Sequence, residues 1–304
     1  MPETIDAWPA LPLEAWQDTY ETLHMWTQIV GKIRKTLTPL VNHWWNVTLY
    51  VTARGLTTSP IPYGPRTFEI DFDFIDHKIE ILTSDGLTKQ IALAPKSVAQ
   101  FYQELMGSLH ALLIDVHIHA SPDEVAAPIP FAKDTTHKSY DAEFAHKFWR
   151  ILVSVDSVFK EFRGPFIGKC SPVHFFWGSF DLAVTRFSGR RAPERPGADA
   201  VTREAYSHEE ISAGFWPGGG EIKGPAFYAY AAPEPAGYKT ARVQPASAFY
   251  HSGMSEFFLM YDDVRRAESP KAMLLDFLES TYAAAADLGK WDRASLERAT
   301  EPRP

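Results

Sequence analysis

The chain has 304 residues and a formal net charge of −8, so it can form one large domain or two smaller ones. Hydrophobic residues make up 45% and charged residues 22% of it, which is typical of a folded globular protein. Net negative charge without a long basic stretch argues against binding to nucleic acid or to an anionic membrane. With one cysteine and no basic and apolar signal segment at the start, we expect a cytoplasmic protein, monomeric or homodimeric, without membrane spans.

Apolar residues at helical spacing predict several long helices. The first ends at Thr38-Pro39, because proline pushes the preceding residue out of the α region. The last begins at Ser269-Pro270, a serine N-cap followed by proline at the first helical position. The predicted helices cover residues 13–37, 98–112, 144–162 and 270–288.

Alternating residues predict antiparallel strands between these helices. The clearest case is Thr67–Phe74, in which Phe68, Ile70, Phe72 and Phe74 alternate with Glu69, Asp71 and Asp73. We interpret the acidic face as turned toward water, with a site for a hard cation as the alternative. Residues 188–205 are expected to form a long loop. The other predicted strands are near residues 45–53, 79–81, 91–93, 116–120, 173–187, 225–231 and 255–261.

The order of helix, strands and helix occurs twice, in residues 1–120 and in residues 142–304, with residues 121–141 as a connection. We therefore predict an α+β fold with two pseudo-repeated halves, each an antiparallel sheet with packed helices, the second with longer loops. The triplets His43-Trp44-Trp45 and His174-Phe175-Phe176 each stand at a predicted strand start after a helix. This match favours an internal duplication over chance similarity.

Several segments resemble a family of bacterial proteins known only as a domain of unknown function, and the resemblance extends over nearly the whole chain. It implies no activity and no catalytic residues. The segments that carry it are Asn42–Trp45, Leu49–Ser59, Ser171–Arg190, Tyr206–Glu209 and Gly214–Gly219.

The pair His117 and His119 is one candidate for a metal site. On a strand, residues two apart share a face, so both imidazoles could bind one metal ion. The alternative is two solvent-facing histidines, since no third ligand has a defined spacing. The sequence contains no nucleotide-binding or metal-binding motif, and it does not identify a cofactor.

A second candidate site lies in the second half, where polar and aromatic residues concentrate more than packing requires. We expect a cleft between the halves that binds a small molecule with an anionic group and an aromatic or apolar body, with enzymatic activity left open. The alternatives are a structural ion pair at this position and a scaffold protein without a site. The predicted catalytic residues are His174, Asp181, His208 and Glu209, and the predicted ligand-binding residues are His43, Trp45, Arg54, Trp177, Arg186, Tyr206 and Trp216.

In this hypothesis Arg54 and Arg186 hold the anion. His174 or His208 transfers protons, and Asp181 or Glu209 orients the imidazole. A regular strand would place Asp181 on the face opposite His174. Their pairing therefore requires an irregularity near Gly178.

Overall fold

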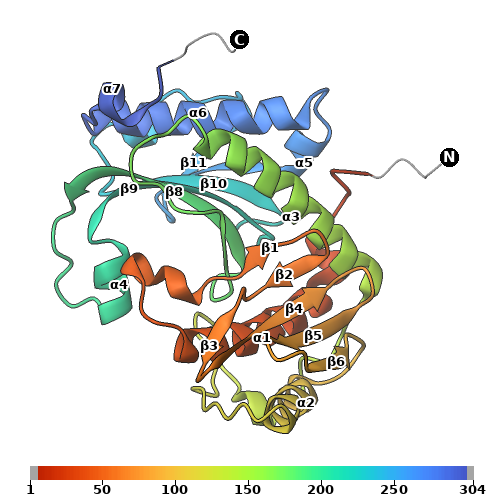
Figure 1. The fold of residues 1–304 in the computed structure, drawn as a ribbon. Coiled ribbons are helices and arrows are strands. Elements are labelled where there is room, and N and C mark those ends of the chain that lie inside the picture. The colour runs from red at the N-terminus through yellow and green to blue at the C-terminus, as the bar shows by residue number, and fades with distance from the viewer. Residues whose placement is uncertain (1–5, 300–304) are drawn as a thin grey trace.

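Two antiparallel sheets form the centre of the molecule (Figure 1). The computed structural model describes residues 6–299. A long helix precedes and another follows each sheet: α1 (Leu13–Leu37) and α2 (Val98–Ala111) for the first, and α3 (Ala142–Arg163) and α6 (Pro270–Leu288) for the second. The predicted α+β class, with an antiparallel sheet and packed helices in each half, is confirmed.

The first sheet has the strand order β1-β2-β4-β5-β6, with β3 paired to β4. Phe68, Ile70 and Phe72 are buried, as their alternation predicts. The strands are β1 (Tyr50–Val51), β2 (Gly55–Thr57), β3 (Ile61–Tyr63), β4 (Arg66–Asp73), β5 (Lys78–Thr83) and β6 (Thr88–Ala92).

The second sheet has the order β11-β12-β10-β9-β8-β7, so most strands pair with their neighbours in sequence. Its strands are β7 (His174–Phe176), β8 (Asp181–Arg191), β9 (His208–Trp216), β10 (Ala226–Ala232), β11 (Phe249–His251) and β12 (Glu256–Met260). The short helices are η1 (Asn42–Val47), η2 (Phe131–Lys133), α4 (Ala200–Ala205), η3 (Tyr238–Thr240), α5 (Tyr261–Arg265) and α7 (Arg293–Leu296).

The long helices begin and end where the local chemistry requires. The bounds of α1 are as predicted, and beyond it the N–H of Thr38 donates to the carbonyl of Arg34. At the start of α6 the Ser269 side chain accepts a hydrogen bond from the N–H of Ala272. Within residues 6–299, none of the helices combines the length and the apolar character needed to cross a bilayer.

Two strand predictions were wrong in the first half. Residues 45–53 do not form one strand, because Asn42–Val47 is a 3-10 helix and the strand covers only Tyr50–Val51. His43 and Trp44 have φ of 59° and 60°, a left-handed conformation that no regular strand contains. The predicted strand at 116–120 has no pairing partner and is irregular.

In the second half the predicted strand 173–187 is a hairpin instead. β7 and β8 pair antiparallel, and a turn at residues 177–180 reverses the chain, with φ of 59° at Phe180. The predicted loop 188–205 is shorter than expected, because β8 continues to Arg191 and α4 begins at Ala200. Strands β9 and β11 were not predicted.

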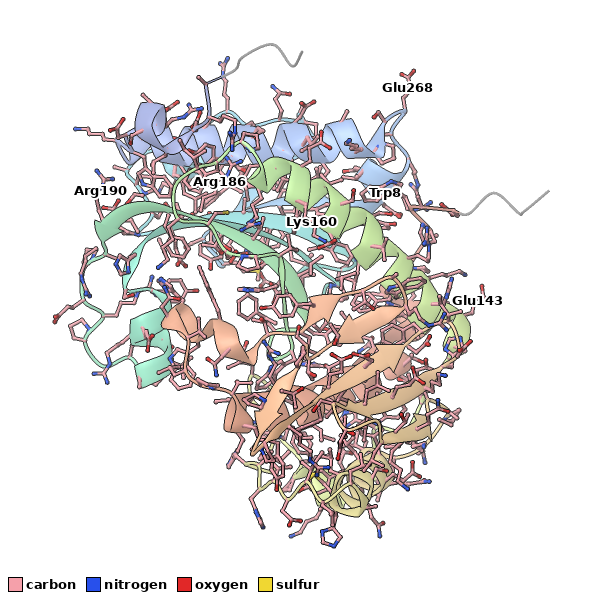
Figure 2. The ribbon with its side chains drawn as sticks, viewed as in Figure 1. Trp8, Glu143, Lys160, Arg186, Arg190 and Glu268 are labelled. Carbon is pink, nitrogen blue, oxygen red and sulfur yellow. The ribbon has the colours of Figure 1, made fainter. Side chains whose placement is uncertain are left out.

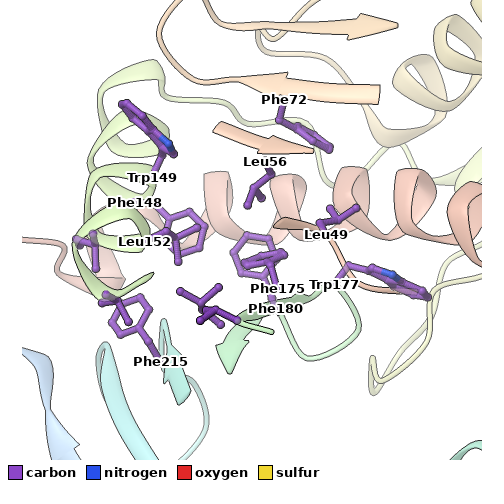
Figure 3. Close-up of a cluster of buried hydrophobic side chains, with 14 of the residues drawn as sticks. Leu49, Leu56, Phe72, Phe148, Trp149, Leu152, Phe175, Trp177, Phe180 and Phe215 are labelled. Carbon is purple, nitrogen blue, oxygen red and sulfur yellow. The ribbon is translucent and has the colours of Figure 1, made fainter. Parts of the chain in front are cut away.

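The first strand of each half lies at an edge of its sheet, and these edges meet. Leu49, just before β1, exchanges both backbone hydrogen bonds with Phe175 of β7, each 2.9 Å long. The buried apolar side chains of both halves form one continuous cluster around this contact. Figure 3 shows part of it, with Leu49, Leu56, Phe148, Leu152, Phe175 and Phe180.

The structure bears on one detail of the predicted duplication. Both halves have the same order of helix, antiparallel strands and helix. The two aromatic triplets, however, do not correspond, because His43-Trp44-Trp45 lies in η1 whereas His174-Phe175-Phe176 forms β7. The duplication therefore stays a prediction that depends on element order alone.

Candidate functional site

A cavity of about 1010 Å³ lies over one face of the second sheet. Alternate residues of β8, Asp181, Ala183 and Thr185, line it. The residues between them lie on the other face, and there Arg186 packs against Phe162 of α3. In the first half, residues of α1 and η1 form part of the cavity wall. In the connection, Asp123 and Glu124 form another part. It therefore lies where the two halves and the connection meet.

The centre of the cavity floor is a hydrogen-bonded group around Asp181. Ser179 donates to Asp181 Oδ1 at 2.5 Å, and Tyr228 donates its hydroxyl hydrogen to Oδ2. Gly214 lies opposite Tyr228, and a Cβ there would lie 2.3 Å from the Tyr228 hydroxyl. Glycine at this position therefore lets the tyrosine ring lie across β9 and reach the carboxylate.

A second carboxyl on the floor belongs to Glu210. It is 6% exposed, and burial raises its pKa to about 8. Nearby, the hydroxyls of Tyr206 and Tyr230 lie 3.4 Å apart, and the Tyr230 ring stacks on that of Tyr228. Glu210 is thus a carboxyl that can hold a proton near neutral pH.

Two further carboxyls, Glu256 and Glu124, lie close enough to Asp181 to interact with its charge. Burial and the charge of Asp181 raise the pKa of Glu256 to about 7, and the same two causes raise the pKa of Glu124. Like charges that lie close together in one site disfavour full ionisation. A cation placed among them would relieve this repulsion.

The lining as a whole is acidic. Among the described residues that line the cavity there are six carboxyl side chains, of which Asp123 is paired with Lys32 behind the lining, but one lysine, Lys35, and no arginine. The histidines do not change this balance: burial lowers the pKa of His24 to about 4 and also lowers that of His43. The carboxyls are those of Asp123, Glu124, Asp181, Asp199, Glu210 and Glu256.

Aromatic rings form much of the remaining lining. Trp177 is fixed by its indole N–H, which donates to the carbonyl of Val47 at 2.6 Å, and by the space left at Gly31 of α1. His24 holds the same turn, since its Nε2 lies 2.8 Å from the carbonyl of Gly178. The other aromatic lining residues include Tyr20, Trp45, Phe176, Phe187, Tyr206, Trp216, Tyr228 and Tyr230.

The structure brings together six of the residues proposed from the sequence and separates five others from the cavity. His174, Arg54, Arg186, His208 and Glu209 do not line it. Those that do are His43, Trp45, Trp177, Asp181, Tyr206 and Trp216.

The predicted pairing of His174 with Asp181 was wrong. The hairpin does put both on one face, but His174 lies opposite Ala183 and Asp181 lies opposite Phe176. His174 is 1% exposed, its ring contacts those of Trp45 and Tyr50, and neither ring nitrogen has a hydrogen-bond partner among residues 6–299. Burial lowers its pKa to about 3, so it is a neutral ring packed behind the cavity.

Neither arginine proposed to hold an anion reaches the cavity. Arg186 is buried on the opposite face of the sheet, between α3 and α6 (Figure 2), where its guanidinium stacks on Phe162 and Tyr282. Arg54 belongs to the first sheet and pairs with Asp73 and Asp76. Neither Arg54 nor Arg186 can therefore hold an anionic group of a ligand in this cavity.

His208 and Glu209 also lie elsewhere. His208 lines a separate small pocket, and its Nδ1 lies 3.0 Å from the hydroxyl of Ser207. Glu209 lies on the other side of β9 and accepts hydrogen bonds from Ser188 and Arg190. Neither can transfer a proton in the cavity.

The metal hypothesis loses its geometric basis. His117 and His119 are exposed and lie in an irregular segment, so they do not share the face of a strand. Within residues 6–299, no group of three or more histidine, cysteine or acidic side chains is arranged to hold a metal ion. The acidic face of β4 is likewise without such a group.

The comparison with known families matches almost the whole chain. A family model, described as a family of unknown function (DUF5996), covers residues 8–298. The chain belongs to the DUF5996 family. This confirms the resemblance that the sequence indicated. No curated protein and no solved structure matches the chain.

In this DUF5996 chain, sequence reasoning missed the carboxyls Glu124, Glu210 and Glu256. Glu210 stands on β9, a strand that was not predicted. The signal was present, because Glu210, Ser212 and Gly214 alternate there with buried apolar residues. Glu124 lies in the connection and Glu256 is the first residue of β12, and no local pattern marks them.

Proposed function

We propose that this protein binds a small organic cation in the cavity of the second sheet. The observation that carries the proposal is the excess of carboxyl side chains in the lining, six against one lysine, since four of them have raised pKa values that a bound cation would lower. This keeps the small-molecule site expected from the sequence and replaces its anionic ligand with a cationic one. The presence of a cavity of this size favours such a site over a scaffold without one.

The arrangement of the carboxyls supports a cation that contacts more than one of them. The charge of Asp181 raises the pKa values of Glu124 and Glu256. Asp181 itself accepts hydrogen bonds from Ser179 and Tyr228 on the cavity floor. A bound cation would stabilise the ionised forms of all three carboxyls at once. Metal ions prefer closely grouped oxygen ligands, and no such group occurs among residues 6–299.

The aromatic lining supports an organic cation in particular. A positive charge over the face of a tryptophan or tyrosine ring is stabilised by about 0.5–2 kcal/mol. Trp45, Trp177 and Trp216 line the cavity from three different elements, and Tyr228 and Tyr230 are stacked along its floor. These rings also offer apolar surface to the body of the ligand.

Choline and its neutral isostere 3,3-dimethylbutan-1-ol test the proposal, because they differ in charge and hardly in shape. We expect isothermal titration calorimetry to show at least about tenfold tighter binding of choline, which corresponds to about 1.4 kcal/mol. Choline carries a permanent charge, so its own titration does not enter. Equal affinity for the two compounds, or tighter binding of the alcohol, would refute the proposal.

Two neighbouring glutamates give a matched pair of variants. Glu210→Gln removes a carboxyl from the cavity floor, whereas Glu209→Gln makes the same change on the opposite face of β9. Above pH 8, where Glu210 is ionised, we expect the first variant to weaken choline binding and the second to leave it unchanged. If Glu209→Gln weakened choline binding and Glu210→Gln did not, the choline site would lie on the face of the sheet opposite the cavity.

A further inference from the structure

A second pocket, of about 460 Å³, lies on the outer side of α4. Ala200, Arg203 and Glu204 of α4 line it, while Val201, Thr202 and Ala205 of the same helix line the large cavity. The two hollows are therefore on opposite sides of α4. The remaining residues of the second pocket are Asn42, His43, Lys169, Arg191, Ser207 and His208.

The charge of this pocket is opposite to that of the cavity. Lys169, Arg191 and Arg203 line it, with Glu204 as the acidic lining residue. Within residues 6–299, none of these three cations forms an ion pair with a carboxylate. The lining therefore has three cationic side chains against one carboxyl side chain.

Lys169 is held in place by a neutral group and by aromatic rings. His43 Nδ1 lies 2.7 Å from the carbonyl of Ala205, so this nitrogen donates. His43 Nε2, 2.5 Å from Lys169 Nζ, is then the acceptor of a hydrogen bond from the ammonium. The ammonium also lies 4.8 Å from the ring centroid of Phe187. Lys169 thus lines the pocket with a neutral imidazole as its hydrogen-bond acceptor.

Neutral hydrogen-bond donors complete the lining. The Ser207 hydroxyl lies 3.0 Å from His208 Nδ1, and Asn42 of η1 also lines the pocket. Two guanidinium groups, an ammonium and a hydroxyl are the groups that proteins use to bind tetrahedral oxyanions. A carboxylate ligand would bind to the same kinds of group, but its single negative charge would balance only part of the positive charge of the pocket.

We infer that this pocket binds a phosphate group, either free inorganic phosphate or the phosphate of a monoester. Arg191 and Arg203 supply paired N–H donors from the rim, and Lys169 supplies a fixed charge from the base. The site depends on its own residues and not on the cavity, although His43 lies between them. Phosphate and choline are separate probes, so failure of one proposal is distinguishable from failure of the other.

Isothermal titration calorimetry at low ionic strength tests the inference with inorganic phosphate and with glycerol phosphate. We expect at least one of the two to bind, and the comparison tells which source of phosphate the pocket prefers. Arg191→Gln and Arg203→Gln should each weaken binding by about tenfold, the effect of losing one charge-assisted hydrogen bond. Both arginines are exposed, so these variants are expected to fold.

Arg266→Gln is the matched control, because Arg266 is an exposed arginine far along the chain, paired with Asp262. It changes the net charge equally and should leave phosphate affinity within about twofold of the wild type. The inference is overturned if neither compound binds at up to about 10 mM. It is also overturned if Arg266→Gln weakens binding as much as Arg203→Gln, since the effect would then be one of net charge alone.

Discussion

Tyr228 donates its hydroxyl hydrogen to Asp181 across Gly214, so a tyrosine of β10 reaches a carboxylate of β8 over the strand between them. This contact determines the shape of the cavity floor. It is possible only because β9 has a residue without a side chain at that point. Its consequences can be measured.

Gly214→Ala should break this contact. The new Cβ would lie 2.3 Å from the Tyr228 hydroxyl, so the ring must move and the protein should lose about 1–3 kcal/mol of stability. Tyr228→Phe removes the same hydrogen bond without moving the ring. In urea denaturation, the double variant should lose less unfolding free energy than the sum of the losses in the two single variants. Full additivity would mean that the two residues do not share one interaction.

Glu210→Gln should change how stability depends on pH. Between the ordinary pKa of glutamate, about 4.3, and the folded value of about 8, the folded state keeps a proton that the unfolded state releases. Wild-type stability therefore falls as pH rises through this window, by up to about 1.4 kcal/mol per pH unit from this group. The variant lacks this loss and should gain on the wild type between pH 5 and pH 8. Parallel profiles in urea denaturation would contradict it, and Glu209→Gln serves as control.

Arg186→Ala should destabilise the protein without affecting choline binding. Its guanidinium lies 3.5 Å from the ring centroid of Phe162 and 4.2 Å from that of Tyr282, in the helix-covered side of the sheet. Truncation leaves a cavity there and should cost about 3 kcal/mol. Arg186→Met, which keeps much of the volume, should cost less. Unchanged thermal stability would contradict this structural role, and a change in choline affinity would show that the residue acts on the cavity.

Two glycines in long helices should respond with opposite sign to replacement by alanine. At Gly31 of α1 a Cβ would lie 2.2 Å from the Trp177 indole, so Gly31→Ala should destabilise by about 1–3 kcal/mol. At Gly107 of α2 nothing lies within 4 Å, so Gly107→Ala should stabilise by about 1 kcal/mol through helix propensity alone. Thermal and urea denaturation measure the sign of the stability change in each variant. Stabilisation at Gly31 would show that Trp177 is not fixed by this contact.

The sequence predicts the elements that have strong local periodicity. The bounds of α1 and the alternation of β4 follow from apolar spacing and from proline at the helix end. The hairpin at residues 177–180 does not follow, because Trp177, Ser179 and Phe180 suit a strand and the turn lacks an Asn-Gly or Asp-Gly pair. The lining of the cavity was therefore predicted only in part. Asp181 and the tryptophans were named from the sequence and line it, whereas Glu210 lies on an unpredicted strand and Glu124 in the connection.

The contact between Leu49 and Phe175 also bears on what each half would do alone. A free strand edge presents unpaired backbone groups that can join another chain. In the intact protein each half covers one edge of the other with a pair of backbone hydrogen bonds. A fragment ending in the connection would expose that edge together with the apolar side chains around it. Because both halves are in one chain, each edge is covered by its partner as soon as the halves pack, and we expect the separated halves to self-associate through these edges.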